Sequence, residues 1–378
     1  MNRVHETIEG EFNRLDALRL NRLEASELYA YYTIPSVFPR LDQSDQTQGI
    51  GMLDSIGSAV VNHFANKLVT TLFSPNRPFF RLAPSPASPA VKELNAALEG
   101  DDTKKQKQAQ AAFDALRSKF VKTEKDSVRY LERIGYRTAA TNAAKLLIIT
   151  GDVVIRAQQD QKPAAYSMRD YVCEKDLTGE DIVLIVRDQL VYGALTDAQR
   201  ALLSAKGGNS AGYTATSPIT IYTRLELQGD RRYLVTQAID NCDIADEVPR
   251  LVTKNDSPFT HLSWNLSKNE NYGRGLVEDF SGSFNMVDSF TNFQAKTGAK
   301  IADLKILVDP ASGIDIERLN STDDGTYIAG KPSDLQAMAS GLDAGMQYME
   351  TIIMAHKRQI SAAFLYQSGN TRDAERVT

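Results

Sequence analysis

The residue types that most often perform chemistry in proteins are few in this sequence and far apart. The two cysteines, Cys173 and Cys242, are not part of a CxxC pair. The four histidines are scattered without a carboxylate or cysteine at the spacing of metal ligands, namely His5, His63, His261 and His356. We therefore expect no metal site and no thiol nucleophile. His356 falls on the apolar stripe of a predicted helix, which favours a structural role.

Carboxylates are also isolated. Asp152, Asp170 and Glu174 stand on predicted strands or at their ends without an arranged partner, so they are predicted to be ordinary surface charges. General acid–base catalysis needs a partner group within hydrogen-bond reach, which this pattern does not indicate. We expect no enzyme activity and no cofactor.

Two short motifs resemble ligand-binding loops without meeting their requirements. The stretch "YGRGLVEDFSGSF" contains Gly273, Gly275 and Gly282, but it lacks GxGxxG spacing and does not follow a strand of a βαβ unit. We interpret it as a tight turn with close helix packing rather than a dinucleotide site. The stretch "NSTDDGT" lacks the alternating acidic residues and closing Glu of a calcium loop, which favours a β-turn.

Composition sets the class of protein. A chain of 378 residues with 42% apolar and 24% charged residues is long enough for two or three folded modules. No apolar run approaches the ~20 residues of a membrane span, and residues 1–20 lack a secretory signal, so no membrane contact is expected. A net charge of −5 argues against tight binding to nucleic acid. The basic run "KKQKQ" at 104–108 is interpreted as a solvated face.

The elements that would position these residues follow from periodicity. Apolar residues at helical spacing predict one amphipathic helix over 5–32. It ends there because "YYTIPSVFPR" contains two prolines, which force extended backbone at Ile34 and Phe38. Val37 and Phe38 are expected to fill an apolar gap. Further helices are predicted at the following ranges: 50–72, 92–99 with Ser88 and Pro89 at its start, 103–134, and 138–150 ended by Gly151.

From Asp152 the apolar period changes from helical to alternating, which predicts an antiparallel β module of roughly a hundred residues. The final third returns to two long helices, over 275–300 and 342–364, separated by short strands and turns. The sequence therefore predicts an α+β protein with helical layers, a β module and a helical stalk that carries a small tip.

Several ordered stretches resemble the head-to-tail connector, or portal, proteins of podoviruses, the short-tailed phages. They are "YYTIPSVFPR", "NKLVTTLFSPNRPFFRL", "TGDVVIRAQ", "IVRDQLVYGAL", "ENYGRGLVEDF" and "SAAFLYQSGNTRDAERVT". The resemblance covers nearly the whole chain and implies the portal fold. The domains that it implies are a wing at 1–274 (helical over 1–150, antiparallel β over 151–274), stem helices at 275–301 and 340–366, a clip at 302–339 and a tunnel loop at 367–378. Portal chains normally continue into a crown, so this sequence is expected to be a fragment of a longer chain.

The resemblance implies a function without catalysis. Portal subunits form a ring, most commonly a dodecamer, around a channel at one capsid vertex, and the genome is packaged through it by the terminase motor and later ejected. The implied partners are double-stranded DNA without sequence preference, the terminase large subunit, tail adaptor proteins, and the major capsid and scaffolding proteins. The implied locations are the head-tail junction of the virion and, during assembly, the host cytoplasm. The alternative is a phage structural or adaptor protein of the head-tail junction that does not conduct DNA.

On this resemblance, three groups of residues are candidates for function. The channel and tunnel loop would contribute Asn370, Thr371, Arg372, Arg376, Lys357 and Arg358. The contact between the stems of neighbouring subunits would contain Phe280, Phe284, Phe290, Phe293, Met349 and Ile353. The clip would dock partners through Asp309, Asp315, Glu317, Arg318, Asp323 and Asp324. Lys357 and Arg358 would either face DNA or pair with an acidic residue of a neighbouring subunit, and Arg376 could cap a following helix.

Overall fold

The computed structural model describes residues 7–40, 51–74, 77–100, 102–158, 161–205, 213–239, 242–243, 250–302, 306–308, 335–337 and 343–366. The chain divides into two compact units. The first contains Met1–Gly51 and Ser58–Asp279, and the second contains Met52–Gly57 and Phe280–Thr378. Helices and antiparallel sheets occur together, so the predicted α+β class is confirmed.

The N-terminal segment forms two helices, α1 (Ile8–Leu18) and α2 (Leu20–Tyr32), so the prediction of one helix is wrong. The helix breaks at Arg19 (φ −109°, ψ 8°), whose buried guanidinium donates to the carbonyl oxygens of Met168 and Tyr171. After α2, the 3-10 turn η1 (Pro35–Val37) leads to Phe38, which is 1% exposed beneath the guanidinium of Arg169. Phe38 therefore fills an apolar gap, as predicted.

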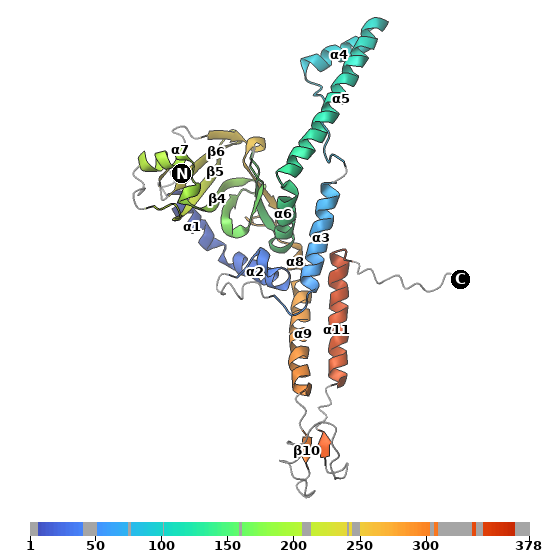
Figure 1. Cartoon of the computed structure of the whole chain (residues 1–378), viewed down its shortest axis with the longest axis vertical. Helices are drawn as coiled ribbons and strands as arrows, with labels where there is room; N and C mark the ends of the chain where they lie inside the picture. Colours follow the sequence, from blue (N-terminus) through green and yellow to red (C-terminus); the bar gives the residue numbers. More distant parts are fainter. Residues whose placement is uncertain are drawn as a thin grey trace, which may run out of the picture. The chain divides into compact units, whose positions relative to one another are not determined.

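Four further helices precede the sheets: α3 (Ile56–Leu72), α4 (Pro89–Glu99), α5 (Thr103–Arg133) and α6 (Tyr136–Thr150). The start of α3 lies six residues after the predicted start, because Asp54 accepts a hydrogen bond from the N–H of Ile56 and begins the helix there. Pro89 occupies the first position of α4, as predicted. Figure 1 shows α4 packed beside one end of the long helix α5.

Two antiparallel sheets follow. The smaller has the order β2-β1-β9 and consists of β1 (Asp152–Arg156), β2 (Ala164–Tyr166) and β9 (Phe259–Ser263). The larger has the order β3-β4-β5-β6-β7, with β8 also paired to β6. Its strands are β3 (Tyr171–Lys175), β4 (Asp181–Val191), β5 (Pro218–Leu227), β6 (Arg232–Ile239), β7 (Cys242–Asp243) and β8 (Arg250–Thr253). Short helical elements connect them, namely η2 (Met168–Asp170), η3 (Tyr192–Ala194), α7 (Asp197–Ala205) and η5 (Lys254–Asp256). The predicted antiparallel β module is confirmed.

Helices cover these sheets through small apolar clusters. Phe12 and Leu15 of α1 pack on one face of the larger sheet, where the Phe12 and Tyr222 ring centroids are 5.3 Å apart. Leu203 of α7 packs on another part of that sheet, and Leu146 of α6 packs on the smaller sheet. Burying a large apolar side chain of this kind contributes roughly 1.5–3 kcal/mol, so these clusters fix the helices to the sheets.

The second unit is built on a helix pair. After α8 (Leu276–Asp279), which closes the first unit, α9 (Ser281–Ala302) and α11 (Asp343–Ala363) run antiparallel and side by side (Figure 1). Between them in sequence, β10 (Ile306–Val308) pairs antiparallel with β11 (Leu335–Ala337). The predicted order of helix, short strands and helix is confirmed.

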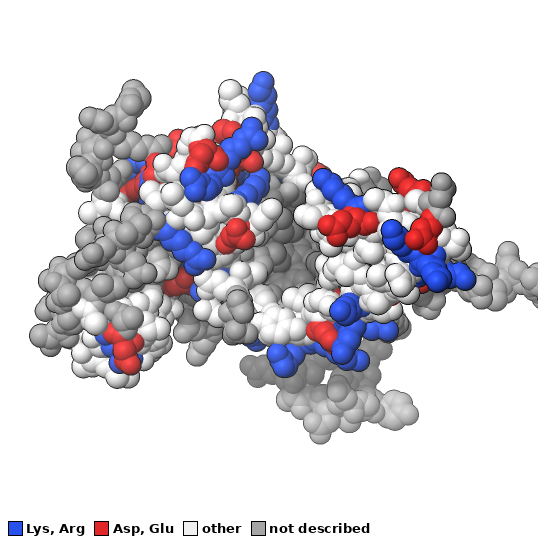
Figure 2. Space-filling model, turned by 90° about the horizontal axis from the view of Figure 1, so that it is seen from above, with Lys and Arg blue, Asp and Glu red and all other residues white. Residues whose placement is uncertain are grey.

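The surface carries both signs of charge. Figure 2 shows Lys and Arg beside Asp and Glu on several parts of the face that it presents.

Within the ranges that the structure describes, none of the helices combines the length and the hydropathy needed to cross a bilayer.

A glycine junction joins α6, β1 and the segment before α8. Gly151 ends α6 with φ +86°, and a Cβ built there would lie 2.3 Å from the backbone nitrogen of Gly275. A Cβ on Gly275 would lie 2.7 Å from the carbonyl oxygens of Ile148 and Ile149. Close packing at Gly273 and Gly275 is thus confirmed. The same interpretation is wrong for Gly282, because no heavy atom lies within 4 Å of its added Cβ.

We expect Gly275→Ala to lower the free energy of unfolding by about 3 kcal/mol, because backbone atoms that cannot rotate away occupy the space of the new Cβ. The matched control is Gly282→Ala in α9, which should be neutral or stabilising by about 0.5–1 kcal/mol, because alanine is the better helix former. Urea unfolding followed by circular dichroism measures both. Equal stabilities for the two variants would contradict the close packing at Gly275.

Candidate functional site

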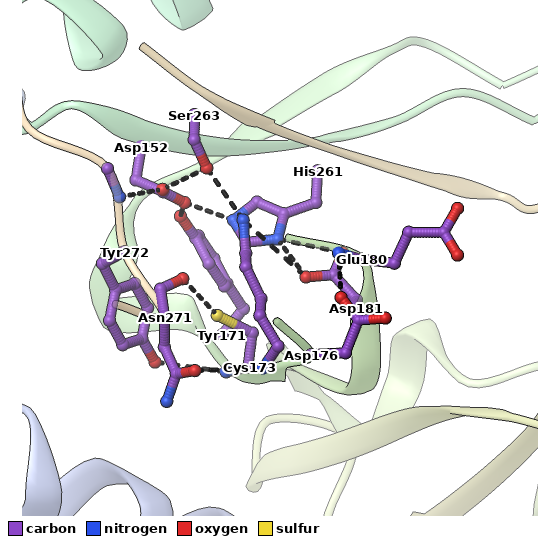
Figure 3. A network of polar contacts seen from close by, with 12 residues as sticks. Asp152, Tyr171, Cys173, Asp176, Glu180, Asp181, His261, Ser263, Asn271 and Tyr272 are labelled. Carbon is purple, nitrogen blue, oxygen red and sulfur yellow. Dashed lines mark hydrogen bonds and ion pairs between the residues drawn. The ribbon is translucent and has the colours of Figure 1, made fainter. Parts of the chain in front are cut away.

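The residues whose side chains are best suited to catalysis or metal binding meet between the two sheets of the first unit (Figure 3). His261 of β9 donates from Nε2 to Asp152 of β1, and from Nδ1 to the two oxygens of Asp181 of β4, at 2.8 and 3.0 Å. The His261 side chain is 2% exposed and that of Asp152 is fully buried. The prediction that Asp152 is a surface charge without an arranged partner is therefore wrong.

Asp152 has three further donors besides the imidazole. They are the Tyr171 hydroxyl at 2.6 Å, the Ser263 hydroxyl at 2.7 Å and the backbone N–H of Gly273 at 2.7 Å. Burial raises the pKa of Asp152, but the charge and hydrogen bond of His261, with the bonds from Tyr171 and Gly273, lower it by more. The pKa of Asp152 thus lies below its ordinary value, and the carboxylate stays ionised.

The histidine is correspondingly held protonated. Burial lowers the pKa of His261, but the charges of Asp152 and Asp181 and the hydrogen bonds to them raise it by more, to about 9. Both ring nitrogens then donate to carboxylates. The resulting ion triad joins β1, β4 and β9, and it therefore connects the two sheets.

Cys173 and Lys175 of β3 complete the network. The Cys173 thiol donates to the carbonyl oxygen of Asn271 at 3.2 Å, and Lys175 Nζ donates to Ser263 Oγ at 2.9 Å and lies 3.9 Å from Asp181. Burial and the nearby carboxylates raise the pKa of the Cys173 thiol, so it is a poor nucleophile.

Metal binding is the other chemistry that this cluster suggests. The ligand atoms of Cys173, Asp181 and His261 lie within 4.8 Å of one another, so the fold brings together donors that are distant in sequence. However, a histidine binds a metal ion only through an unprotonated ring nitrogen. Both ring nitrogens of His261 instead face carboxylates. With Lys175 as the second cation, two positive groups already balance Asp152 and Asp181. The geometry therefore favours a structural ion network.

The predicted stem residues lie on different sides of the α9–α11 pair. Phe284 is fully buried against Phe364, with ring centroids 6.1 Å apart, and Phe280 lies at the same distance from that ring. Ile353 is also buried, Phe290 and Met349 are half-buried, and Phe293 is 54% exposed. Phe284 thus belongs to the core of the pair itself, while Phe293 lies on its surface. His356 contacts Ser283 at 3.3 Å, in keeping with a structural role.

The predicted channel residues are only partly within the described ranges. Lys357 pairs with Asp54 of the same chain. Arg358 is exposed. Six residues of the clip and four of the tunnel loop lie outside the described residues. They are Asp309, Asp315, Glu317, Arg318, Asp323, Asp324, Asn370, Thr371, Arg372 and Arg376.

Sequence reasoning missed the buried network, although one signal for it exists. In "FTHLS" the alternation of β9 places His261 and Ser263 on the same face as the buried Phe259. An inward-facing histidine in a strand requires a polar partner, because burying it alone is costly. Asp152, opposite Ser263 in the ladder, could not be identified as that partner without the pairing register.

We expect the stability of the chain to fall as pH rises from 6.5 through 9 because of His261. Its folded pKa of about 9 lies above the ordinary 6.5, so its contribution, about 3 kcal/mol, is complete below pH 6.5 and is lost as the folded state deprotonates. Urea unfolding between pH 6 and pH 10 measures this. His261→Gln should be destabilised at pH 6 and lack this pH component, whereas His63→Gln, at an exposed helical position, should retain it. A His261→Gln profile parallel to wild type would contradict the assignment.

Comparison with known proteins identifies the family. Residues 5–378 match the protein family described as "Bacteriophage head to tail connecting protein". The portal protein of Enterobacteria phage SP6 is 25% identical over 358 residues, which is 94% of this chain and 65% of that protein. The portal protein of Escherichia phage T7 is 25% identical over 355 residues, which is 92% of this chain and 63% of that protein. The chain thus spans less than two thirds of the length of these relatives.

Among solved structures, the neck of a native GTA particle computed with C12 symmetry matches with a TM-score of 0.29 at 13% identity, covering 65% of this chain and 59% of that chain. This likeness is too low to support a conclusion about architecture or symmetry. The family match extends over nearly the whole sequence and confirms the resemblance that the sequence motifs indicated. The chain belongs to the bacteriophage head to tail connecting proteins.

Proposed function

We propose that this chain is a phage portal subunit, which forms a ring around a DNA channel at one capsid vertex. The genome is packaged through this channel by the terminase motor and later ejected, and the tail attaches to the same ring. The observation that carries the proposal is the family match over residues 5–378, with relatives named portal proteins that align with more than 90% of the chain. The proposal includes no catalytic step, in keeping with the structural character of the buried ion network.

The α9–α11 pair supports ring formation through its exposed apolar residues. Met286 and Phe293 are seven residues apart on α9 and therefore share a face, and they are 36% and 54% exposed. Met354 in the middle of α11 and Leu365, two residues past its end, are 47% and 51% exposed. A second copy of the chain would cover these side chains in a head-to-tail contact, and such a contact closes into a ring when the rotation between copies allows it. We propose twelve copies, the number most common in the family.

The charge distribution is suited to passing DNA without holding it. An acidic subunit repels the phosphate backbone, whereas clustered cations would retain it. In the proposed ring the duplex meets a few positive residues of the tunnel loop, Arg372 and Arg376 beside Asn370 and Thr371, together with the exposed Arg358. Lys357 contributes less, because Asp54 neutralises it.

The proposed partners occupy both ends of the ring. The acidic residues predicted in the clip would dock the terminase large subunit and, after packaging, the tail adaptor proteins. Major capsid and scaffolding proteins would surround the wing. In this proposal the protein is located at the head-tail junction of the virion and in the host cytoplasm during assembly.

Ring assembly tests the proposal. We expect mass photometry and electron micrographs of the purified protein to show rings of about twelve subunits with an open centre that admits the duplex. Phe293→Glu should prevent assembly, because it places a charge in the apolar contact, yet leave the fold intact, since Phe293 is exposed. Ala299→Glu, an exposed position on another face of α9, is the matched control and should assemble normally.

Three results would count against the proposal. Intact rings of the Phe293→Glu variant would refute the stem contact. Monomers or dimers of the wild-type protein at every salt concentration would refute autonomous ring formation. Closed assemblies without a central opening would favour the alternative, a junction protein that does not conduct DNA.

A further inference from the structure

Helix α5 has a charge opposite to that of the rest of the chain. Its 31 residues contain nine Lys and Arg and four Asp and Glu, a net charge of +5. The whole chain carries −5, so the remainder carries −10.

The charges of α5 are also sorted by face. The side towards α4 and residues 81–84 holds the apolar residues and the buried Glu124, which accepts a hydrogen bond from the Leu82 N–H at 2.6 Å. The opposite side carries six exposed cations at helical spacing, which we call the α5 basic stripe. They are Lys104, Lys107, Lys122, Lys125, Arg129 and Arg133.

Little negative charge is available to neutralise this stripe. Asp126 pairs with Arg129 at 3.4 Å, and Glu132 is bound by Arg137, which does not belong to the stripe. Within the described ranges, no carboxylate lies at ion-pair distance from Lys104, Lys107, Lys122 or Lys125. The sequence-based interpretation of "KKQKQ" as a solvated face considered only the first turns of α5, whereas the structure adds Lys122, Lys125, Arg129 and Arg133 to the same side.

We infer that the α5 basic stripe binds the phosphate backbone of duplex DNA, at a surface separate from the proposed channel and without sequence preference. A helix of 31 residues is ~46 Å long and rigid, so its cations can contact successive phosphates and release condensed counterions. No base-reading geometry is required. The stripe belongs to the first compact unit and shares no residue with the predicted tunnel loop.

An acidic protein is the competing partner for such a surface, and the side chains of the stripe disfavour it. Stable protein interfaces have a core of apolar or aromatic anchors. Between its cations the stripe presents Ala111, Ala115 and Ser118, which are all small, and the ring of Tyr130 beside it is covered by the Arg133 guanidinium. Interfaces with DNA are more polar and far more positive than interfaces between proteins, which matches the composition of the stripe.

A covalently closed circular duplex is the appropriate probe, because it cannot thread through a closed ring and reports only on outer surfaces. Binding to the full chain is measured by electrophoretic shift from 50 to 200 mM salt. The variant Lys122→Gln/Lys125→Gln/Arg129→Gln should bind at least tenfold more weakly at 100 mM salt. The slope of log K against log salt should decrease in magnitude by about 2–3, since each lost phosphate contact contributes about 0.9.

The matched control is Lys67→Gln/Lys162→Gln/Lys268→Gln, which removes the same charge from exposed lysines outside α5. It should retain most of the affinity and the salt slope, and both variants should unfold at the wild-type urea concentration. Equal losses in the two variants would overturn the inference, because net charge alone would explain binding. Absence of wild-type binding at 50 mM salt would also overturn it and leave an acidic protein as the partner. Neither result depends on whether the protein forms rings.

Discussion

The architecture of the first unit depends on one buried carboxylate. Asp152 is fully buried and must be compensated, because an unpaired charge in the interior costs several kcal/mol. Its donors come from three places: Tyr171 on β3, His261 and Ser263 on β9, and the N–H of Gly273 before α8. Since none of these segments can move away without leaving the charge unpaired, this single group fixes the relation of both sheets to the segment that leads into α8.

The helices meet the same junction through a second polar contact. Arg22 of α2 donates to the carbonyl oxygens of Thr150 at 3.0 Å and Gly273 at 2.6 Å, and to Glu278 of α8 at 2.6 Å. It thereby satisfies the Thr150 carbonyl at the end of α6, one of the groups that a helix terminus leaves without an intrahelical partner. The contacts of the histidine, cysteine and carboxylates in this region favour a structural role over a catalytic one.

The two proposed contact surfaces rely on different physics. Exposed apolar residues such as Phe293 gain free energy from leaving water and suit a permanent contact between subunits. The α5 basic stripe contains cations without apolar anchors and suits a contact that slides and depends on salt. An acidic chain in which one helix carries a net positive charge can combine free passage of DNA in one place with attachment in another.

What the sequence determined was local. It predicted the α+β class, the antiparallel strands, the end of α6 at Gly151 and the family, because periodicity, turn residues and motifs involve neighbours along the chain. Only the tertiary structure decided that the first helix breaks at Arg19, that Asp152 is buried and that His261 lies between two carboxylates. It also separated the buried Phe284 from the exposed Phe293. These outcomes depend on distances between residues far apart in sequence, and no spacing along the chain contains those distances.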